Sequence, residues 1–463
     1  MKELLKSNKF KWGLVIVVTL LTLLIPESET FHFQVKLFLA STLFNILLLA
    51  FSLTHPIVPS ILLPMSYWIL NISTPQVIFG AWSNQITWVL LGGLLFADMM
   101  TSSGISKRIA YNCMKLARGN FILLMFIMLV PGIIIAAFVP AVVARCALFA
   151  SIMMSLCEAL DYKAGSKKAV IAFAVGYIVS SNTGWLFYTG SNANIIAMGA
   201  LTSININVDF SRFLLCNFVP ELFWLIGSVI IVIFLYRDKQ KSDSKVVKAY
   251  IDEQCKNLGK MTSSEIKMAI IMIVVIVLLF TSSYHSLNPG QIFCLAAIVG
   301  LLPAIGLLDG KSIQKTNFTM VFLVAGCVAI GDVASELGAG AVLIDSLLPY
   351  APHSFVPLNL FIWLITFIGN FLMTPLALIA SLSTPIVNLA QALGFSPEAM
   401  MYLFLFSTSC IALPYEITAS LLLFGYGMMS MKDFFKIFMI ISIWTAICII
   451  VLMIPWFTII GLI

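Results

Sequence analysis

Two stretches of this sequence place polar side chains where the chain is otherwise apolar, and they are the first candidates for chemistry. Residues 181–194 and 413–420 interrupt long hydrophobic segments with hydroxyl, amide and glycine residues. Inside a membrane, irregular backbone survives only where it is buried in protein or lines a cavity. Helix N-termini there suit anions, whereas helix C-termini and unwound carbonyls suit cations. These stretches therefore favour binding an anion beside a coupling cation.

Two charged residues lie deep in apolar segments. Arg145 follows Pro140 by about a turn and a half of helix, and Glu416 lies within the second polar stretch. A charge at mid-membrane costs at least ~2.5–3.5 kcal/mol, so neither side chain is expected to face lipid. Arginine offers a two-pronged donor that matches carboxylate or sulfate, so Arg145 is predicted to bind the anion or to stand in for a coupling cation. Glu416 is predicted to bind a proton or a cation. A structural ion pair of Arg145 with Glu416 or Asp98 is the alternative.

The composition defines the class of protein that these residues serve. The chain has 463 residues, of which 61% are hydrophobic and 10% charged, and its mean hydropathy is +1.05. A soluble domain has about 25% charged residues, so this is a helical membrane protein. Its continuous apolar runs exclude an outer-membrane barrel, and its small net charge of +6 argues against a nucleic-acid partner. The nine cysteines contain no C-x-x-C and the four histidines do not cluster, so no metal is predicted.

Apolar runs and the basic loops between them predict an all-α polytopic protein with about 11 transmembrane helices and two re-entrant helical hairpins. Basic residues before the first span place the N-terminus in the cytoplasm, and the last span, 437–461, places the C-terminus outside. The first span imitates a signal peptide, but no A-x-A-like site precedes Pro26, so we expect it to be retained. A bacterial plasma membrane is the expected location.

The chain is predicted to divide into four segments: an N-terminal span 1–32, a first repeat 33–236, a cytoplasmic linker 237–266 and a second repeat 267–463. In the first repeat a hairpin, 120–158, precedes a broken span, 169–201. In the second repeat a hairpin, 357–392, precedes a broken span, 398–427. Two full spans would satisfy the basic flanks of 120–158 equally well, but each arm has under 20 residues, which favours a hairpin.

Three residues recur at a constant offset of 234 positions in the two halves: Gly92, Asp98 and Gly104 return as Gly326, Asp332 and Gly338. Each set precedes a proposed hairpin, and each hairpin midpoint carries a proline. The loop charges indicate that the first hairpin enters from inside and the second from outside. Two halves of like sequence and opposite orientation are typical of inverted-repeat secondary transporters.

With these motifs the sequence resembles the divalent anion:sodium symporter (DASS) family, most clearly from Gly92 to Lys436. Where the family reads G-T-P-P-N-x-I in its first broken span, this chain reads Gly190-Ser191-Asn192-Ala193-Asn194-Ile195-Ile196. In the second broken span Leu413-Pro414 and Phe424-Gly425-Tyr426-Gly427 match the family's L-P and F-G-x-G with the same spacing. The resemblance implies transport of dicarboxylates, citrate or sulfate by a homodimer with an elevator-like movement.

The chain departs from the family at both hairpin tips. The family places Ser-Asn-Thr there, whereas this chain has Val139-Pro140-Ala141 and Met373-Thr374-Pro375. A literal Ser181-Asn182-Thr183 lies just before the first break, and Ile417-Thr418-Ala419-Ser420 holds the T-P-P-N positions of the second. The predicted substrate-binding residues are Pro140, Arg145, Thr189, Ser191, Asn192, Thr374, Pro375 and Thr418. The predicted cation-coupling residues are Asn182, Thr183, Gly190, Asn194, Glu416 and Ser420.

The predicted function is secondary active transport of a small anion, a di- or tricarboxylate or a sulfate-like ion, coupled to sodium or protons. A sodium-independent anion exchanger and a transporter of a larger anionic substrate are alternatives, because both tip asparagines are lost. A channel or a binding sensor is a further reading. An intramembrane enzyme lacks support, since the chain has no H-E-x-x-H, no G-x-S-x-G and no paired aspartates of the protease kind. No catalytic residue and no cofactor beyond the coupling Na⁺ or H⁺ is predicted.

Overall fold

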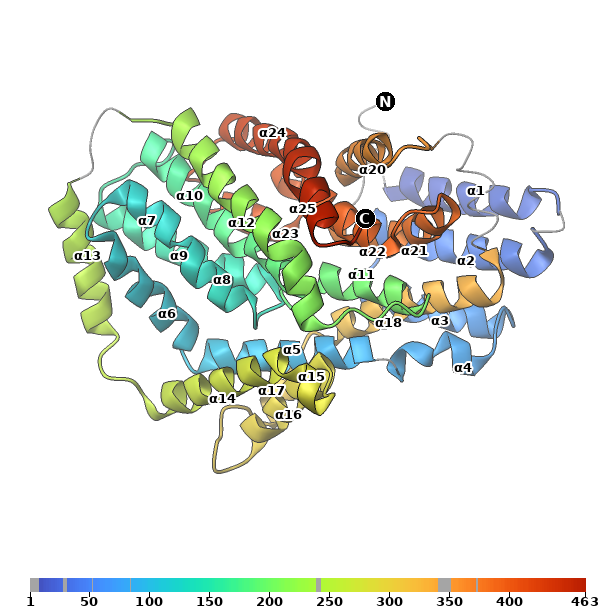
Figure 1. Cartoon of the computed structure of the whole chain (residues 1–463), viewed down its shortest axis with the longest axis horizontal. Helices are drawn as coiled ribbons and strands as arrows, with labels where there is room; N and C mark the ends of the chain where they lie inside the picture. Colours follow the sequence, from blue (N-terminus) through green and yellow to red (C-terminus); the bar gives the residue numbers. More distant parts are fainter. Residues whose placement is uncertain are drawn as a thin grey trace.

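All regular elements in the described part of the computed structural model are helical (Figure 1). The structure describes residues 8–27, 31–51, 53–83, 85–238, 243–339, 351–371 and 374–463. Its helices up to residue 235 are α1 (Asn8–Leu24), α2 (Phe33–Ala50), α3 (Ile57–Ile69), α4 (Pro75–Ile78), α5 (Gln85–Ser102), α6 (Ile105–Met114), α7 (Phe121–Ile127), α8 (Leu129–Ala136), α9 (Val142–Ala159), α10 (Lys167–Ser181), α11 (Asn192–Thr202) and α12 (Phe210–Leu235).

The helices after residue 235 are α13 (Ser244–Asn257), α14 (Ser263–Phe280), α15 (Ser282–His285), α16 (Pro289–Leu301), α17 (Gly310–Lys315), α18 (Phe318–Glu336), α20 (Phe355–Asn370), α21 (Pro375–Ala392), α22 (Pro397–Ser407), α23 (Thr418–Phe424), α24 (Met431–Cys448) and α25 (Ile454–Ile459). Short turns of other helix types are η2 (Gly80–Trp82), η3 (Lys115–Ala117), η4 (Asn182–Leu186), η5 (Pro414–Glu416) and a π-helical turn, Ile449–Met453.

Six described helices are long and apolar enough to cross a membrane, and the number rises to seven if α5 and α6, bent by 65° at their junction, count as one span. This is fewer than the eleven spans predicted from the sequence. Six shorter apolar helices of 10–17 residues, among them α3, α16 and α20, are not counted as spans. A helix of that length reaches only about 15–26 Å, less than the ~30 Å of the hydrocarbon core.

Two segments predicted as loops contain helices. Residues 105–117, which lie in a basic stretch between apolar runs, form α6 and η3, and the linker 237–266 contains α13. Both helices are amphipathic, and they bury one apolar face while their lysines stay outside. They pack against each other, and Tyr111 on α6 and Tyr250 on α13 are buried. Their low hydropathy hid these helices from a search for apolar runs.

The glycines that recur in sequence have matching structural roles. Gly104 has a φ of +81° just beyond the end of α5, and Gly338 has a φ of +65° just beyond the end of α18. Glycine adopts this left-handed conformation without steric cost. Gly92 on α5 lies against the backbone of α16, and Gly326 on α18 lies against the backbone of α3. The recurrence therefore marks helix ends and close helix contacts in both halves.

The two halves pack crosswise around the middle of the molecule. Helix α11 follows the first break and packs on α21 of the second hairpin segment, while α23 follows the second break and packs on α9 of the first. The Cys146 thiol on α9 donates a hydrogen bond of 3.0 Å to the carbonyl oxygen of Ala419 on α23. Residues of both breaks, among them Leu186 and Ile411, belong to one buried hydrophobic cluster.

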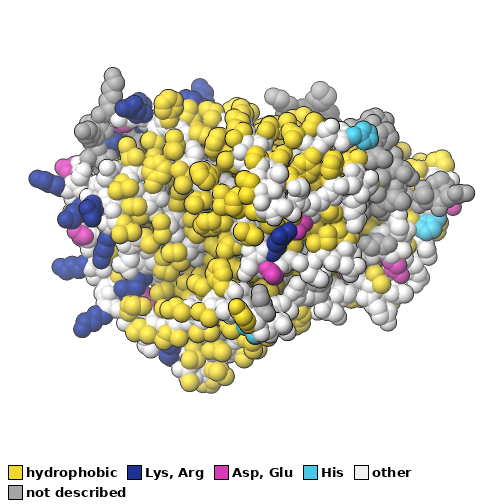
Figure 2. All heavy atoms as spheres, in the orientation of Figure 1, with side chains coloured by type: hydrophobic (Ala, Val, Ile, Leu, Met, Phe, Trp, Pro, Cys, Tyr) yellow, Lys and Arg dark blue, Asp and Glu magenta, His cyan; other side chains and the backbone are white. Residues whose placement is uncertain are grey.

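Charged side chains are distributed unevenly over the surface. Lysine and arginine gather at the left end of the molecule in Figure 2, where Figure 1 places α13 and the beginning of α7. A broad band of hydrophobic side chains covers the middle of this face. Such a band beside a basic end is the surface expected of a protein embedded in lipid with one face toward the cytoplasm.

Candidate functional site

The first break separates α10 from α11 and is shaped by two glycines. The chain leaves α10 at Ser181, makes the turn η4 and re-enters a helix at Asn192, whose N-cap Ser191 accepts a hydrogen bond of 3.3 Å from the Ala193 amide. A Cβ on Gly184 would lie 2.4 Å from the Gly190 carbonyl oxygen, and one on Gly190 would lie 2.3 Å from the Gly184 oxygen. Only glycine at both positions lets the two ends of this loop touch.

Arg145 fills the space between this break and the first hairpin tip. Its guanidinium donates to four main-chain carbonyl oxygens: Nε to Ser180 at 2.7 Å, Nη1 to Gly190 at 2.6 Å and to Val139, and Nη2 to Ser181 at 3.4 Å. The residue is 1% exposed. The carbonyls come from the hairpin tip, the end of α10 and the break itself, so one side chain joins three segments.

The hydrogen bonds of Arg145 explain how its charge is tolerated. Each hydrogen bond to a charged group contributes about 1.5–3 kcal/mol. Four of them outweigh the ~2.5–3.5 kcal/mol that inserting a central arginine costs. The ion pairs among described residues are Lys36–Glu27, Arg108–Glu265 and Arg212–Glu398. The alternative of an Arg145 ion pair with Glu416 or Asp98 is therefore wrong for this conformation.

The second break separates α22 from α23, and its carboxylate is held by the main chain. Glu416 accepts hydrogen bonds from the amide of Ala412, at 3.2 Å, and from that of Leu413, at 2.8 Å. It thereby caps the turn η5 and is 2% exposed. The Ser420 hydroxyl donates to the carbonyls of Pro414, at 2.8 Å, and Ile417, at 2.7 Å. Thr418, the first residue of α23, is exposed.

Most of the other residues predicted in the first half bind main-chain groups. The Thr189 hydroxyl donates to the Ala137 carbonyl at 2.8 Å, and the Thr183 hydroxyl donates to Val179 at 2.7 Å. The Asn194 amide nitrogen donates to the carbonyls of Gly184, at 2.9 Å, and Phe187, at 2.8 Å. Asn182 is buried, and Pro140 packs against α5 at Gly93. The structure thus brings these residues together around Arg145.

The second hairpin tip is described only in part. Thr374 caps α21 by accepting a hydrogen bond of 3.3 Å from the Ala377 amide, and Pro375 occupies the first turn of that helix. Met373, which the sequence places at the tip, lies outside the described residues. Contact of the predicted residues with an anion or a coupling cation stays a prediction.

Three asparagine side-chain oxygens near the breaks are buried without a hydrogen-bond partner among the described residues: Asn192 Oδ1, Asn194 Oδ1 and Asn370 Oδ1. Asn370 ends α20, and its amide nitrogen donates to the carbonyl of Cys410 in the second break. Buried acceptors normally have a partner, which makes these three oxygens candidates for contact with a ligand. Sequence reasoning missed Asn370, although it is a polar residue in an apolar hairpin arm just before the tip.

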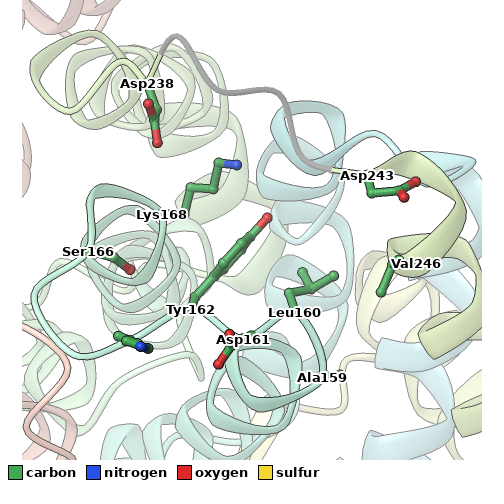
Figure 3. A pocket seen from close by; sticks show the side chains of 10 residues that line it. Ala159, Leu160, Asp161, Tyr162, Ser166, Lys168, Asp238, Asp243 and Val246 are labelled. Atoms are coloured by element: carbon green, nitrogen blue, oxygen red, sulfur yellow. The ribbon is translucent and has the colours of Figure 1, made fainter.

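A separate cavity of about 580 Å³ lies far from the breaks, at the opposite end of α9 (Figure 3). Its lining includes the 159–163 turn, Lys168, Asp238 and Asp243. The Lys168 ammonium lies 5.1 Å from the centre of the Tyr162 ring. Because α9 has 18 residues, its ends are about 27 Å apart. This mixed-charge cavity belongs to the basic end of the molecule rather than to the site.

Comparison with known proteins identifies the family to which this chain belongs. The family model described as "Sodium:sulfate symporter transmembrane region" matches residues 6–463. The chain belongs to this family, which confirms the resemblance seen in the sequence. It is an integral membrane protein and a secondary anion transporter rather than an enzyme.

All the relatives described here are distant. An "Uncharacterized transporter" of Haemophilus influenzae is 23% identical over 420 residues, covering 86% of each chain. "Inner membrane protein YbhI" of Escherichia coli is 21% identical over 396 residues, covering 82% of this chain and 81% of its own. "Dicarboxylate transporter 1, chloroplastic" of Arabidopsis thaliana is 24% identical over 201 residues, covering 41% of this chain and 35% of its own.

Two solved structures share the fold at 13% identity. The YdaH transporter of Alcanivorax borkumensis aligns with a TM-score of 0.51 over 88% of this chain and 98% of its own. MtrF of Neisseria gonorrhoeae, described as illuminating a class of antimetabolite efflux pumps, aligns with a TM-score of 0.50 over 87% of this chain and 95% of its own. At this identity the likeness supports the fold alone.

Proposed function

We propose that this protein carries a small multivalent anion, a di- or tricarboxylate or sulfate, across the bacterial plasma membrane by an elevator-type movement within a homodimer. The observation that carries this proposal is the crosswise packing of α11 on α21 and of α23 on α9. Through it, two breaks and two hairpin segments meet in one buried region, which is the arrangement expected of an inverted-repeat transporter.

Helix ends favour an anion as substrate. Helices α9 and α21 begin just after the two hairpin tips, and α11 begins just after the first break. Each N-terminus carries partial positive charge and free N–H groups. Buried Arg145 adds a full positive charge beside them. The chloroplast dicarboxylate transporter among the relatives is in keeping with a carboxylate substrate.

The distribution of charge supports the proposed orientation. The basic end of the molecule faces the cytoplasm under the positive-inside rule. The linker 237–266, which contains α13, then lies on the cytoplasmic side. The lysines before the first span assign the N-terminus to the same side. The C-terminus lies outside, and the two repeats cross the membrane in opposite directions.

Coupling to sodium or protons is the expected energy source. The unpartnered oxygens of Asn192, Asn194 and Asn370 are ligands that suit Na⁺ or a proton-bearing donor. The carbonyls around Arg145 favour a second candidate, a sodium-independent exchanger, because a fixed cation already occupies one group of oxygen ligands.

Thermal unfolding of the purified protein with a panel of anions tests this function. A ligand that binds only the folded state stabilises it by RT ln(1 + [L]/Kd). We expect citrate, succinate or sulfate to raise the melting temperature, and a monocarboxylate of similar size to leave it unchanged. Runs in sodium and in choline medium, at two pH values, separate the coupling ions. The absence of a shift with every small anion would contradict the proposal.

A further inference from the structure

We propose that the guanidinium of Arg145 is a tethered cation that permanently occupies a carbonyl-lined cation site, so that this one site needs no inorganic cation from solution. This inference rests on the proposed transport function. It concerns how one half of the site is held together, and it assigns Arg145 to that task rather than to direct contact with the anion.

The groups that surround Arg145 are the kind that bind a metal cation. An arginine that binds an anion would instead keep its N–H groups free. Four main-chain oxygens converge on it, and no carboxylate of the described residues pairs with it. Carbonyl oxygens in unwound backbone are the usual ligands of Na⁺ in transporters. Ser180 and Ser181 also end α10, where the helix dipole is negative.

The geometry leaves little of Arg145 for an anion. Arginine has five N–H donors, and four of them point at carbonyl oxygens. The Nη2 atom also lies against Gly184, where an added Cβ would approach it to 2.6 Å. Binding a carboxylate through two N–H groups would require Arg145 to give up hydrogen bonds to the carbonyls of the first break.

The segments joined by Arg145 are those that must come together before the first half can bind a ligand. Val139 belongs to the hairpin tip, Ser181 to the end of α10 and Gly190 to the loop before α11. A dissolved cation would assemble these segments only when bound. A tethered guanidinium assembles them at all times, which removes cation binding as a requirement at this site. The side chain also places a positive charge beside the first break, which favours an anion nearby.

Removing the side chain should turn the tethered cation site into an ordinary one. We would reconstitute the unchanged protein, Arg145→Ala and Arg145→Lys in liposomes. Arg212→Ala is the matched control, because Arg212 pairs with Glu398 and does not contact the carbonyls around Arg145. Uptake of the anion identified by thermal unfolding would be measured in choline, sodium and low, non-denaturing guanidinium media of equal ionic strength.

The proposal predicts that Arg145→Ala loses uptake about tenfold or more in choline medium, because charged hydrogen bonds are lost. Sodium or guanidinium ions should restore it to within about threefold of the unchanged protein. Arg145→Lys and Arg212→Ala should gain no new cation dependence. If Arg145→Ala folds only in the presence of sodium or guanidinium, its melting temperature should rise with the concentration of that cation.

Two results would overturn the proposal. One is a variant without Arg145 that responds to no cation in uptake or in melting, and the other is a variant that keeps full uptake in choline. Failure of the proposed function is a different outcome, because the unchanged protein would then show no saturable uptake in any medium.

Discussion

At the scale of single residues, the buried charged side chains at the two breaks are stabilised by main-chain hydrogen bonds. Arg145 donates to carbonyl oxygens of the first break, whereas Glu416 accepts from amides of the second. Unwound backbone has unpaired polar groups, and a charged side chain of the right sign satisfies several of them at once. Each break is thus stabilised by hydrogen bonds between its main chain and one charged side chain, an arginine in the first break and a glutamate in the second.

Glu416 is expected to act first as a cap. Glu416→Ala leaves the amides of Ala412 and Leu413 without their acceptor, and a buried unsatisfied donor costs about 1–3 kcal/mol. Glu416→Gln keeps an acceptor oxygen and should lower the melting temperature less. Equal damage by both variants would contradict the capping role. If Glu416→Gln also abolishes the pH dependence of uptake, Glu416 is the proton-binding residue predicted from sequence.

Gly190 is expected to tolerate no side chain. Gly190→Ala places a Cβ 2.3 Å from the Gly184 carbonyl oxygen, so the loop must move and take a carbonyl ligand of Arg145 with it. We expect a loss of uptake of about tenfold or more and a lower melting temperature, since overpacking costs about 1–3 kcal/mol. Gly13→Ala, with nothing within 4 Å, is the matched control. Normal uptake by Gly190→Ala would show that the loop is not fixed.

The polar residues of both breaks could be recognised from the sequence, but their partners could not. Arg145 and Glu416 stand out because charge is costly in an apolar run. Their partners are main-chain atoms, which every residue carries, and so no residue type marks them. Asn370 was missed because its amide bonds to a carbonyl in the second break, a contact that requires the tertiary fold.

At the scale of elements, paired glycines end equivalent helices in the two halves. Gly104→Ala and Gly338→Ala should each lower the free energy of unfolding by about 1–2 kcal/mol, because both positions have positive φ. Gly310→Ala should have little effect, since no positive φ is recorded there and nothing lies within 4 Å. Melting curves of the three variants provide the measurement. A change confined to one of the two positive-φ sites would contradict the structural equivalence of the halves.

Some elements with continuous apolar sequence have bounds within a few residues of those expected from the sequence. The first broken span, for example, was predicted at 169–201 and is formed by α10, η4 and α11. The helices α6 and α13 were not predicted, because they are stabilised by contacts between their narrow apolar faces. Six or seven described helices are long enough to span by themselves, and the predicted count of about 11 spans stays a prediction.

At the scale of the whole molecule, the crosswise packing could not be predicted from spacing or hydropathy. It depends on which helix faces meet, and only the fold supplies that information. In this packing, α11 contacts α21 and α23 contacts α9, so the helix after each break packs against a hairpin segment of the other half. These contacts link each break to the other half of the chain.

The proposed orientation predicts the side on which each end of the chain lies. A fluorescent protein fused at the N-terminus should fluoresce, because it folds in the cytoplasm. Alkaline phosphatase fused at the C-terminus should be active, because it folds outside. Cys255 on α13, which is partly exposed, should react with a maleimide only from the cytoplasmic side. Labelling of Cys255 from outside intact cells would reverse the assignment.

The measurement that tests the central claim most directly is uptake of a radiolabelled di- or tricarboxylate, or of sulfate, into proteoliposomes. The liposomes would be preloaded with the same unlabelled anion or left empty, with and without a sodium or proton gradient. The account predicts saturable accumulation that requires a cation gradient or internal anion and is lost in Gly190→Ala. Uptake of every such anion at the rate of protein-free liposomes, from a protein that remains folded, would contradict it.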